Sequence, residues 1–217
     1  MLRHGRVFFK KALVKLSRSE PGGIDRLIIL LAGCAVTGTT APSRFYMLSP
    51  LSESKEQAQV ALQEECIAIG IGPVEVAEYL NRPQIVTRLS SNELKLAEFD
   101  QWAEPLKDNF SRVLAENLSS LLCADAIAVF PWGGSTPIDY RVEVEVVRLD
   151  GAVGGNAVLD VRWAIYREED RRMLFTKKSS LSEATNGPGY EAFVSAQSRT
   201  IELLSREIAK EIKNILP

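Results

Sequence analysis

Two neighbouring stretches in the second half of the chain alternate apolar and polar residues, and this alternation constrains the fold more than any other feature. In the stretch 140–147, Val142, Val144 and Val146 are separated by charged residues. The stretch 157–166 repeats the alternation through Val161, Trp163 and Ile165, and a third strand is predicted from Met173 to Leu181. Successive side chains of a strand point to opposite faces, so each stretch buries one face and leaves the other exposed. The pattern predicts an antiparallel meander of three strands with one face to be covered.

Two longer segments have the helical period and are predicted to cover the apolar face of the meander. In the segment 102–122, apolar residues recur every three or four positions, and Pro105 stands near the start, where a missing amide costs little. A second helix is predicted after Gly187-Pro188-Gly189, from Tyr190 to Ile215. Its apolar positions are Tyr190, Val194, Ile201, Leu204, Ile208, Ile212 and Ile215. Both segments are typical of amphipathic helices that pack on a sheet.

Shorter strands are predicted ahead of the meander. They cover 44–48, 66–71 and 74–77 with a kink at Gly72-Pro73, a hairpin formed by 84–88 and the residues around 94–97, and 126–132. The segment 49–65 is polar and predicts a loop with room for a helical turn. Together these elements predict an α+β fold, a single domain whose mostly antiparallel or mixed β-sheet is packed on one face by two long α-helices.

The N-terminal segment is typical of an exported, lipid-modified chain. Seven Lys and Arg residues precede an apolar run that ends in Leu31, Ala32, Gly33 and Cys34, a sequence that resembles the lipobox of bacterial lipoproteins. The small residues before Cys34 leave room for a peptidase, so cleavage is expected between Gly33 and Cys34. The Cys34 thiol is then the predicted lipid attachment site, and several acyl chains on one residue give a stable anchor. The alternative is a buried cysteine after a short helix or strand.

This interpretation divides the chain into three parts. Residues 1–33 are the predicted signal peptide, 34–42 a lipidated tether rich in small residues, and 43–217 the folded domain. Removing the leader leaves 184 residues, enough for one well-buried core and too few for two comfortable ones. No apolar run approaches the roughly 20 residues that span a bilayer.

Charge and histidine content narrow the function. The leader holds seven of the 26 basic residues and two of the 28 acidic ones, so the processed chain has a formal net charge of −7. This charge argues against nucleic acid as a partner. The single histidine, His4, lies in the leader, which excludes histidine-based triads and histidine zinc sites. We expect a non-enzyme without a metal or cofactor.

Two cysteines remain besides Cys34. Cys66 and Cys123 could form a disulfide in an oxidising compartment, or each could pack as a small apolar residue at the end of its own element. Two cysteines provide no spacing pattern to test, and the sequence favours separate packing.

Several motifs in order along the chain resemble a known family, the ABC-type transport auxiliary lipoproteins of the PqiC or YmbA type. The motifs are Phe45-Tyr46, Gly70-Ile71-Gly72-Pro73-Val74, the run from Tyr79 to Arg88, Trp102 to Leu106, Arg112 to Leu118, Phe130-Pro131-Trp132 and Ser205 to Ala209. They cover nearly the whole predicted domain. Among these residues, Trp102 and Trp132 are expected in the core or at its rim, and Asn117 is expected to satisfy backbone groups between helix and sheet.

The resemblance implies a non-catalytic accessory of an ABC or MCE-type transporter that moves lipids or hydrophobic compounds between the inner and outer membranes and supports outer-membrane integrity. The implied partners are an MCE-domain periplasmic protein and the permease and ATPase of the same system, with a homo-oligomer possible. Because Ala35 follows Cys34 where an inner-membrane retention signal would have aspartate, the resemblance favours the outer membrane, facing the periplasm. The alternative is an independent periplasmic lipoprotein that binds a lipid or a cell-wall fragment.

Overall fold

The predicted meander forms the larger part of a five-stranded sheet. In the computed structural model, which describes residues 41–51, 66–134 and 136–216, β6 (Tyr140–Gly151), β7 (Asn156–Arg167) and β8 (Arg172–Ala184) run antiparallel. The buried valines of β6 pair with buried apolar residues of β7, namely Val142 with Ile165, Val144 with Trp163 and Val146 with Val161. The two-residue period therefore marks the covered face of the sheet.

Two parallel pairings complete this sheet in the order β5-β2-β6-β7-β8. β2 (Ile67–Val76) lies between β5 (Ala124–Val129) and β6 and is parallel to both. The predicted kink at Gly72-Pro73 is a register shift inside one continuous strand. Gly72 has φ +122°, and a Cβ there would lie 2.7 Å from the Cβ of Phe130, so both the backbone and the neighbour require glycine. The predicted α+β class with a mixed sheet is confirmed.

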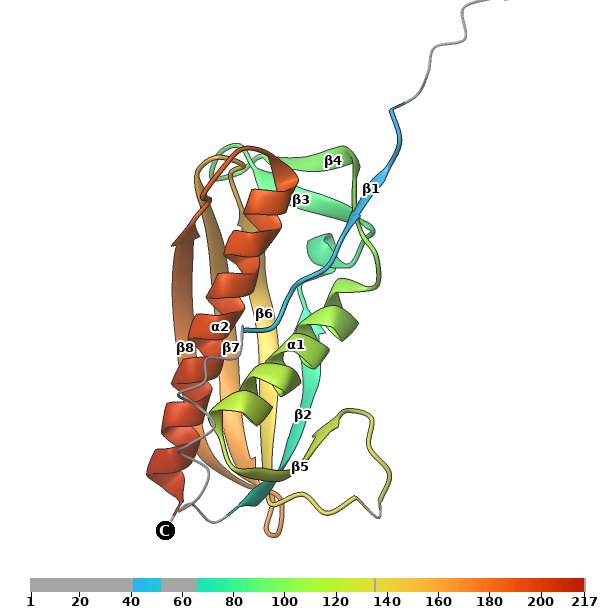
Figure 1. Ribbon diagram of the computed structural model, residues 1–217. Helices are drawn as coiled ribbons and strands as arrows, with labels where there is room; N and C mark the ends of the chain where they lie inside the picture. The colour runs from blue at the N-terminus through green and yellow to red at the C-terminus, as the bar shows by residue number, and fades with distance from the viewer. Residues whose placement is uncertain (1–40, 52–65, 135, 217) are drawn as a thin grey trace, which may run out of the picture. The chain divides into compact units, whose positions relative to one another are not determined.

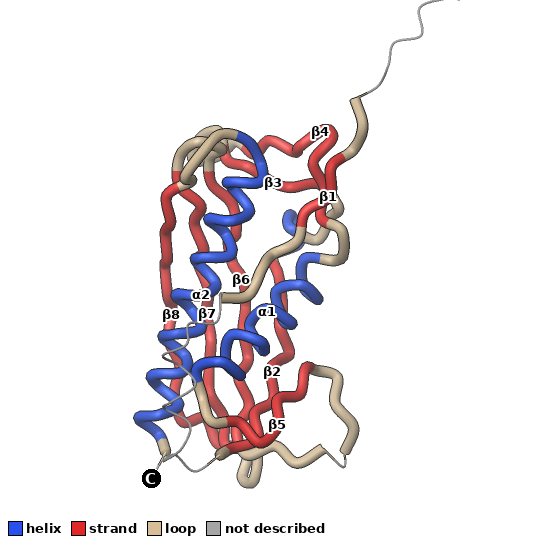
Figure 2. The backbone as a smooth tube through the Cα atoms, in the orientation of Figure 1, coloured by secondary structure: helices blue, strands red, loops and turns tan. Residues whose placement is uncertain are grey.

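Both long helices cover one face of the five-stranded sheet (Figures 1 and 2). α1 spans Leu106–Leu121 and α2 spans Gly189–Ile215. Their fully buried side chains, which include Phe110, Leu114, Phe193 and Ile201, join the strand residues in one core. Each helix therefore buries the apolar stripe that its sequence predicts.

The start of the first helix differs from the prediction. Trp102 is the last residue of β4 (Leu94–Trp102), and its backbone N–H donates to the Pro83 carbonyl at 2.7 Å. Pro105 disfavours helical backbone at the residue before it, so the helix begins only at Leu106. Trp102 is nevertheless buried, as expected for a core aromatic.

The remaining strands form a separate three-stranded sheet, in the order β1-β4-β3. β3 (Gln84–Arg88) and β4 form the predicted antiparallel hairpin, and the 3-10 helix η2 (Glu78–Leu80) precedes it. β1 (Arg44–Tyr46) is shorter than predicted and pairs with β4 in parallel. This small sheet lies at the end of the domain where α2 begins, opposite the end where β5 lies (Figure 1).

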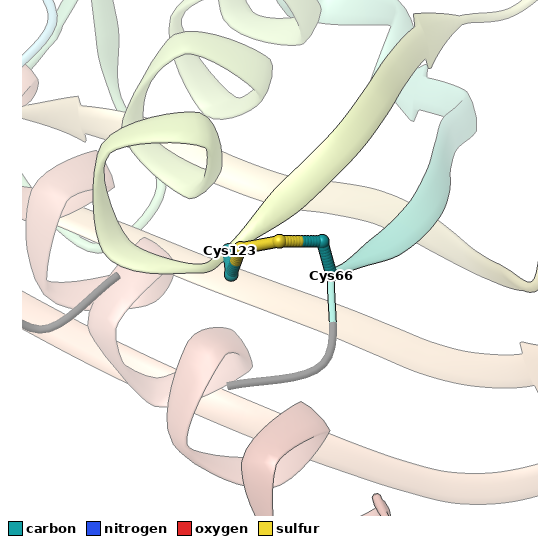
Figure 3. The surroundings of a disulfide bond; sticks show 2 residues. All are labelled: Cys66 and Cys123. Carbon is teal, nitrogen blue, oxygen red and sulfur yellow. A yellow bond between two sulfur atoms is a disulfide. The ribbon is translucent and has the colours of Figure 1, made fainter. Parts of the chain in front are cut away.

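Cys66 and Cys123 are joined in a disulfide, so the prediction of separate packing is wrong (Figure 3). The two residues directly precede β2 and β5, which are neighbours in the sheet. The Ile67 N–H also donates to the Cys123 carbonyl at 3.2 Å, so the parallel pairing of β2 and β5 brings the cysteines together. That pairing joins residues far apart in the sequence, and for this reason the spacing of the cysteines did not indicate it. The predicted loop 49–65 lies mostly outside the described residues.

Candidate functional site

The predicted lipobox, Leu31, Ala32, Gly33 and Cys34, lies outside the described residues. What the structure describes is the place where the chain that follows Cys34 joins the domain. We call residues 44–51, which comprise β1 and the five residues after it, the N-terminal strap. If Cys34 carries a lipid, the strap connects the membrane anchor to the core.

A buried carboxylate fixes the first part of the strap. Asp100 of β4 accepts a hydrogen bond from Arg44 Nη2 at 3.0 Å and another from the Tyr46 hydroxyl at 2.8 Å. Burial, and then the hydrogen bond to Asp100, raise the pKa of Tyr46, and the same carboxylate raises the pKa of Arg44. Both groups therefore keep the protonated forms in which they donate to Asp100. One side chain thus holds the two ends of β1.

Two buried asparagines of α1 hold the rest of the strap. Asn109 Oδ1 accepts the Leu48 N–H at 2.7 Å, and Asn117 Oδ1 accepts the Leu51 N–H at 2.8 Å. Asn117 also donates to Ser205 Oγ of α2 at 3.0 Å. Eight positions on a helix turn through a little more than two turns, so both amides face the strap. These amides satisfy backbone groups that no strand partner reaches, as the sequence predicted for Asn117.

The strap has both buried and exposed apolar side chains. Leu48 and Leu51 are buried, whereas Phe45 is 63% exposed and Met47 45%. The Ser49 N–H donates to Ser198 Oγ of α2 at 3.1 Å. Contacts with β4, α1 and α2 therefore fix both the path of the strap and the side on which its apolar side chains point outward.

A second buried carboxylate joins the small sheet to the large one. Asp150, near the end of β6, is fully buried and accepts hydrogen bonds from Arg88 Nη2 of β3 at 2.7 Å and Arg148 Nε at 2.6 Å. The Tyr79 hydroxyl of η2 donates to it at 3.0 Å. We call these four residues the Asp150 cluster. They connect β3, β6 and η2 by groups 62 and 71 positions apart in sequence.

The electrostatics of the Asp150 cluster favour the charged carboxylate. Burial by itself would raise the pKa of Asp150, but the hydrogen bonds from Arg88, Arg148 and Tyr79 outweigh it and hold the pKa below its ordinary value of 3.8. Burial, and then the charge of Asp150, raise the pKa of Tyr79 to about 12. The cluster is therefore an ion pair network with a neutral tyrosine donor at neutral pH.

A hollow on the helix-free face of the five-stranded sheet has a mixed lining, in which Pro73, Tyr166 and Met173 lie beside charged side chains. Its volume is about 340 Å³, and its lining includes Glu75, Glu143, Glu145 and Arg162. Ligand pockets for apolar molecules are lined mainly by apolar side chains. The four charged side chains in the lining distinguish this hollow from such a pocket.

Neither a spanning helix nor a metal cluster is found in the part of the chain that the structure describes. None of its helices is long and apolar enough to cross a membrane. No group of three or more His, Cys, Asp or Glu side chains is placed to hold a metal ion there.

Sequence reasoning found Asn117 and missed Asp100, Asp150 and Asn109. Asp150 follows a bulge between Val146 and Arg148, after which Leu149 takes the core face opposite Leu159. Asp150 therefore lies on the other face of the sheet, where Arg88 and Tyr79 bind it. Asn109 had a usable signal, because it is polar and eight positions before Asn117 on the same helical face. Asp100 had no such signal in the sequence, since Arg44 and Tyr46 of β1 reach it only through the parallel pairing of β1 with β4.

The fold and the strap agree with one class of proteins. The family model described as "ABC-type transport auxiliary lipoprotein component" matches residues 46–209, so the chain belongs to this family. The match begins within β1 and ends in α2, and it includes both asparagines and both buried carboxylates. The family is one of transport auxiliary lipoproteins and not a known enzyme family.

Individual relatives are consistent with this membership. The chain is 23% identical over 185 residues to the intermembrane transport lipoprotein PqiC of Escherichia coli K12, covering 85% of this chain and 93% of PqiC. The PqiC of Shigella flexneri matches to the same extent. Among solved structures, an uncharacterized protein matches with a TM-score of 0.63 and 21% identity, over 79% of this chain and 99% of that one. A Xanthomonas campestris protein matches with a TM-score of 0.58 and 14% identity, over 76% and 92%. These two structural matches show the fold alone.

Proposed function

We propose that this chain is a lipid-anchored, non-catalytic accessory of an ABC or MCE-type transporter. In this proposal the leader is cleaved between Gly33 and Cys34, and Cys34 carries the acyl chains. The observation that carries the proposal is the family match over 46–209, which begins at the strap beside the predicted anchor. PqiC, which matches over most of both chains, is described as an intermembrane transport lipoprotein, and this supports a role in transport between two membranes.

The strap supports the anchoring part of the proposal. A lipid at Cys34 would act on the domain through residue 44, where Asp100 holds Arg44 and Tyr46. Beyond it, Asn109 and Asn117 connect the strap to α1, and Asn117 continues to α2. The domain would therefore be held at one defined end, which suits a protein that must present a surface to a partner.

The proposed place is the periplasmic face of the outer membrane. Ala35 rather than aspartate follows Cys34, and no described helix spans a membrane. The proposed partners are the MCE-domain protein and the permease and ATPase of the same system. The transported compound is proposed to be a lipid or another hydrophobic molecule, carried by the partners and not by this domain. Four charged side chains in the mixed lining of the hollow on the helix-free sheet face support this part of the proposal.

Two measurements on material from the native host test the proposal. Intact-mass spectrometry should find a chain that begins at Cys34 and carries acyl groups, whereas a Cys34→Ala variant should keep its leader and lose the lipid. Density separation of the two membranes should then place the wild-type protein with the outer membrane. An unmodified chain that retains residues 1–33 would refute the anchor.

The transport role needs a separate experiment. Crosslinking in intact cells, followed by affinity capture, should recover the MCE-domain protein or the permease. A deletion strain should also show raised permeability of its outer membrane to apolar dyes. Recovery of neither partner, with unchanged permeability, would refute the accessory role. A small molecule that remains bound to the purified protein in native mass spectrometry would instead support an independent binding protein.

A further inference from the structure

Large exposed apolar side chains gather at the small-sheet end of the domain. Ten such side chains occur among the described residues, and five of them belong to the strap and the β3–β4 hairpin: Phe45, Met47, Leu89, Leu94 and Leu96. Single exposed apolar residues are ordinary on any protein surface. Five of the ten large exposed apolar side chains lie in one small sheet and the segments beside it, and such a concentration needs a physical explanation.

Phe45 and Met47 cannot turn inward without breaking the strap. Side chains alternate along an extended chain, and the positions on either side of Phe45 are Arg44 and Tyr46, which both bind Asp100. Leu48, after Met47, is buried, and its N–H is held by Asn109. The polar contacts of the strap therefore keep a phenylalanine and a methionine in the solvent-exposed positions.

The β3–β4 hairpin adds a second exposed group in the same sheet. Leu89 is 60% exposed, and its N–H donates to the Glu93 carbonyl at 3.0 Å, which closes the turn. Leu94 and Leu96 follow on β4, the strand with which β1 pairs. The three leucines and the two strap residues thus belong to one three-stranded sheet and its connections.

The length of chain between Cys34 and the strap limits which end of the domain can face the anchoring membrane. Phe45 stands eleven positions after Cys34, and a chain of that length spans at most about 40 Å when fully extended. α2 has 27 residues, so it is also about 40 Å long, and it runs from the small-sheet end toward the β5 end (Figure 1). If the β5 end faced the membrane, the tether would have to extend along nearly the full length of the domain, which is almost its maximum span. If the small-sheet end faced the membrane, the tether would not have to extend along the domain.

We propose that the small-sheet end, through Phe45, Met47, Leu89, Leu94 and Leu96, rests on the bilayer that holds the lipid of Cys34. The acyl chains keep the protein at the membrane, and these side chains enter the lipid surface and set the orientation of the domain. The β5 end, with the exposed Val129 and Phe130, then points away from the membrane. This inference rests on the proposed lipidation of Cys34.

The test uses the lipidated full chain from the native host in vesicles of phosphatidylethanolamine and phosphatidylglycerol. A small fraction of the phospholipid carries a photoactivatable group on an acyl chain. After illumination, mass spectrometry of the peptides should find labels in 45–47 and 89–96. The double variant Phe45→Ser, Met47→Ser should lower labelling of 89–96 about tenfold, the change that about 1.4 kcal/mol of lost lipid contact produces.

The matched control is Phe130→Ser with Met173→Ser. These are the same residue types, and they are 50% and 49% exposed in the native chain. The control should leave the labelling of 89–96 unchanged. Labels at 129–130 instead, or no labels on protein that sediments with the vesicles, would overturn the proposed orientation and leave the lipid anchor standing. A chain without acyl groups that fails to sediment would overturn the anchor and the orientation together, and intact mass separates these two results.

Discussion

The five-stranded sheet and the three-stranded sheet share one apolar core but differ in how far buried polar contacts hold them. The first buries rows of valine, isoleucine and leucine under α1 and α2. The second adds Ile85, Val86 and Trp102 to the same core, and polar contacts fix it further, because Asp150 joins β3 to β6 and Asp100 holds β1 on β4. Apolar burial is large and non-directional, whereas a satisfied buried polar group accepts few geometries. The comparison suggests that the large sheet supplies most of the stability and that the polar contacts define the position of the anchored end.

The largest effect should come from the core of the large sheet. Phe193 of α2 is fully buried, and Phe193→Ala should lower the free energy of unfolding by about 3–5 kcal/mol, because it removes a ring and leaves a cavity. Urea denaturation of the processed chain measures this. Phe130→Ala is the matched control, because that ring is half exposed, and it should cost less than about 1 kcal/mol. Equal losses in the two variants would remove the basis of the comparison.

Loss of the disulfide should cause the second largest decrease in the free energy of unfolding. Cys66 and Cys123 are 57 positions apart, so their bond restricts a long loop in the unfolded chain, and its loss should cost about 2–4 kcal/mol. The double variant Cys66→Ala, Cys123→Ala should match the wild type measured in reductant, since both lack only the crosslink. Unchanged stability of the wild type in reductant would contradict a stabilising role for this bond within the large sheet.

The Asp150 cluster tests the polar attachment. Asp150→Asn should lower the free energy of unfolding by about 2–3 kcal/mol, because hydrogen bonds to a buried charge are lost. Glu145→Gln is the control. It breaks an ion pair with Arg162 whose side chains are 51% and 57% exposed, and it should cost at most about 1 kcal/mol.

The same cluster predicts a pH dependence. The pKa of Asp150 is lowered by folding, so its contribution is complete above the ordinary value of 3.8 and is lost as the pH falls through the lower, folded value. The difference in unfolding free energy between the wild type and Asp150→Asn should therefore be constant near neutral pH and narrow below about pH 4. Urea titrations across this range measure it, and a gap that widens in acid would contradict the sign.

The smallest effect should come from the strap. Asn117→Ala leaves the buried Leu51 N–H without its acceptor and should cost about 1–2 kcal/mol. Hydrogen exchange should quicken at the amides of Leu48, Ser49 and Leu51 and remain unchanged in β6 and β7. Ser120→Ala is the control on the same helix, because Ser120 is on its exposed side. Faster exchange throughout the domain would mean that Asn117 supports the whole core and not the strap alone.

The sequence predicted elements with a clear period far better than contacts between distant segments. The valines of β6, the stripe of α2 and the hairpin of β3 and β4 were all predictable, because neighbouring residues carry the signal. The parallel pairing of β2 with β5 was not predicted, and the Cys66–Cys123 disulfide was missed for the same reason. The site divides likewise: Asn117 was found within the family motif Arg112 to Leu118, whereas Asp100 and Asp150 acquire their roles only from strands that come together in three dimensions.

Two of the residues that hold the strap in place are synthesised last, because they belong to the C-terminal helix α2. The Ser49 N–H needs Ser198, and Asn117 needs Ser205, both on the C-terminal helix. A nascent chain that has already emerged as far as β7 still lacks these two serines, so its membrane-proximal segment is fastened only by α1 and β4. Synthesis of α2 therefore completes the contacts that hold the strap, through which a lipid on Cys34 would act on the domain. A chain that ends before Ser198 would lack two of these contacts.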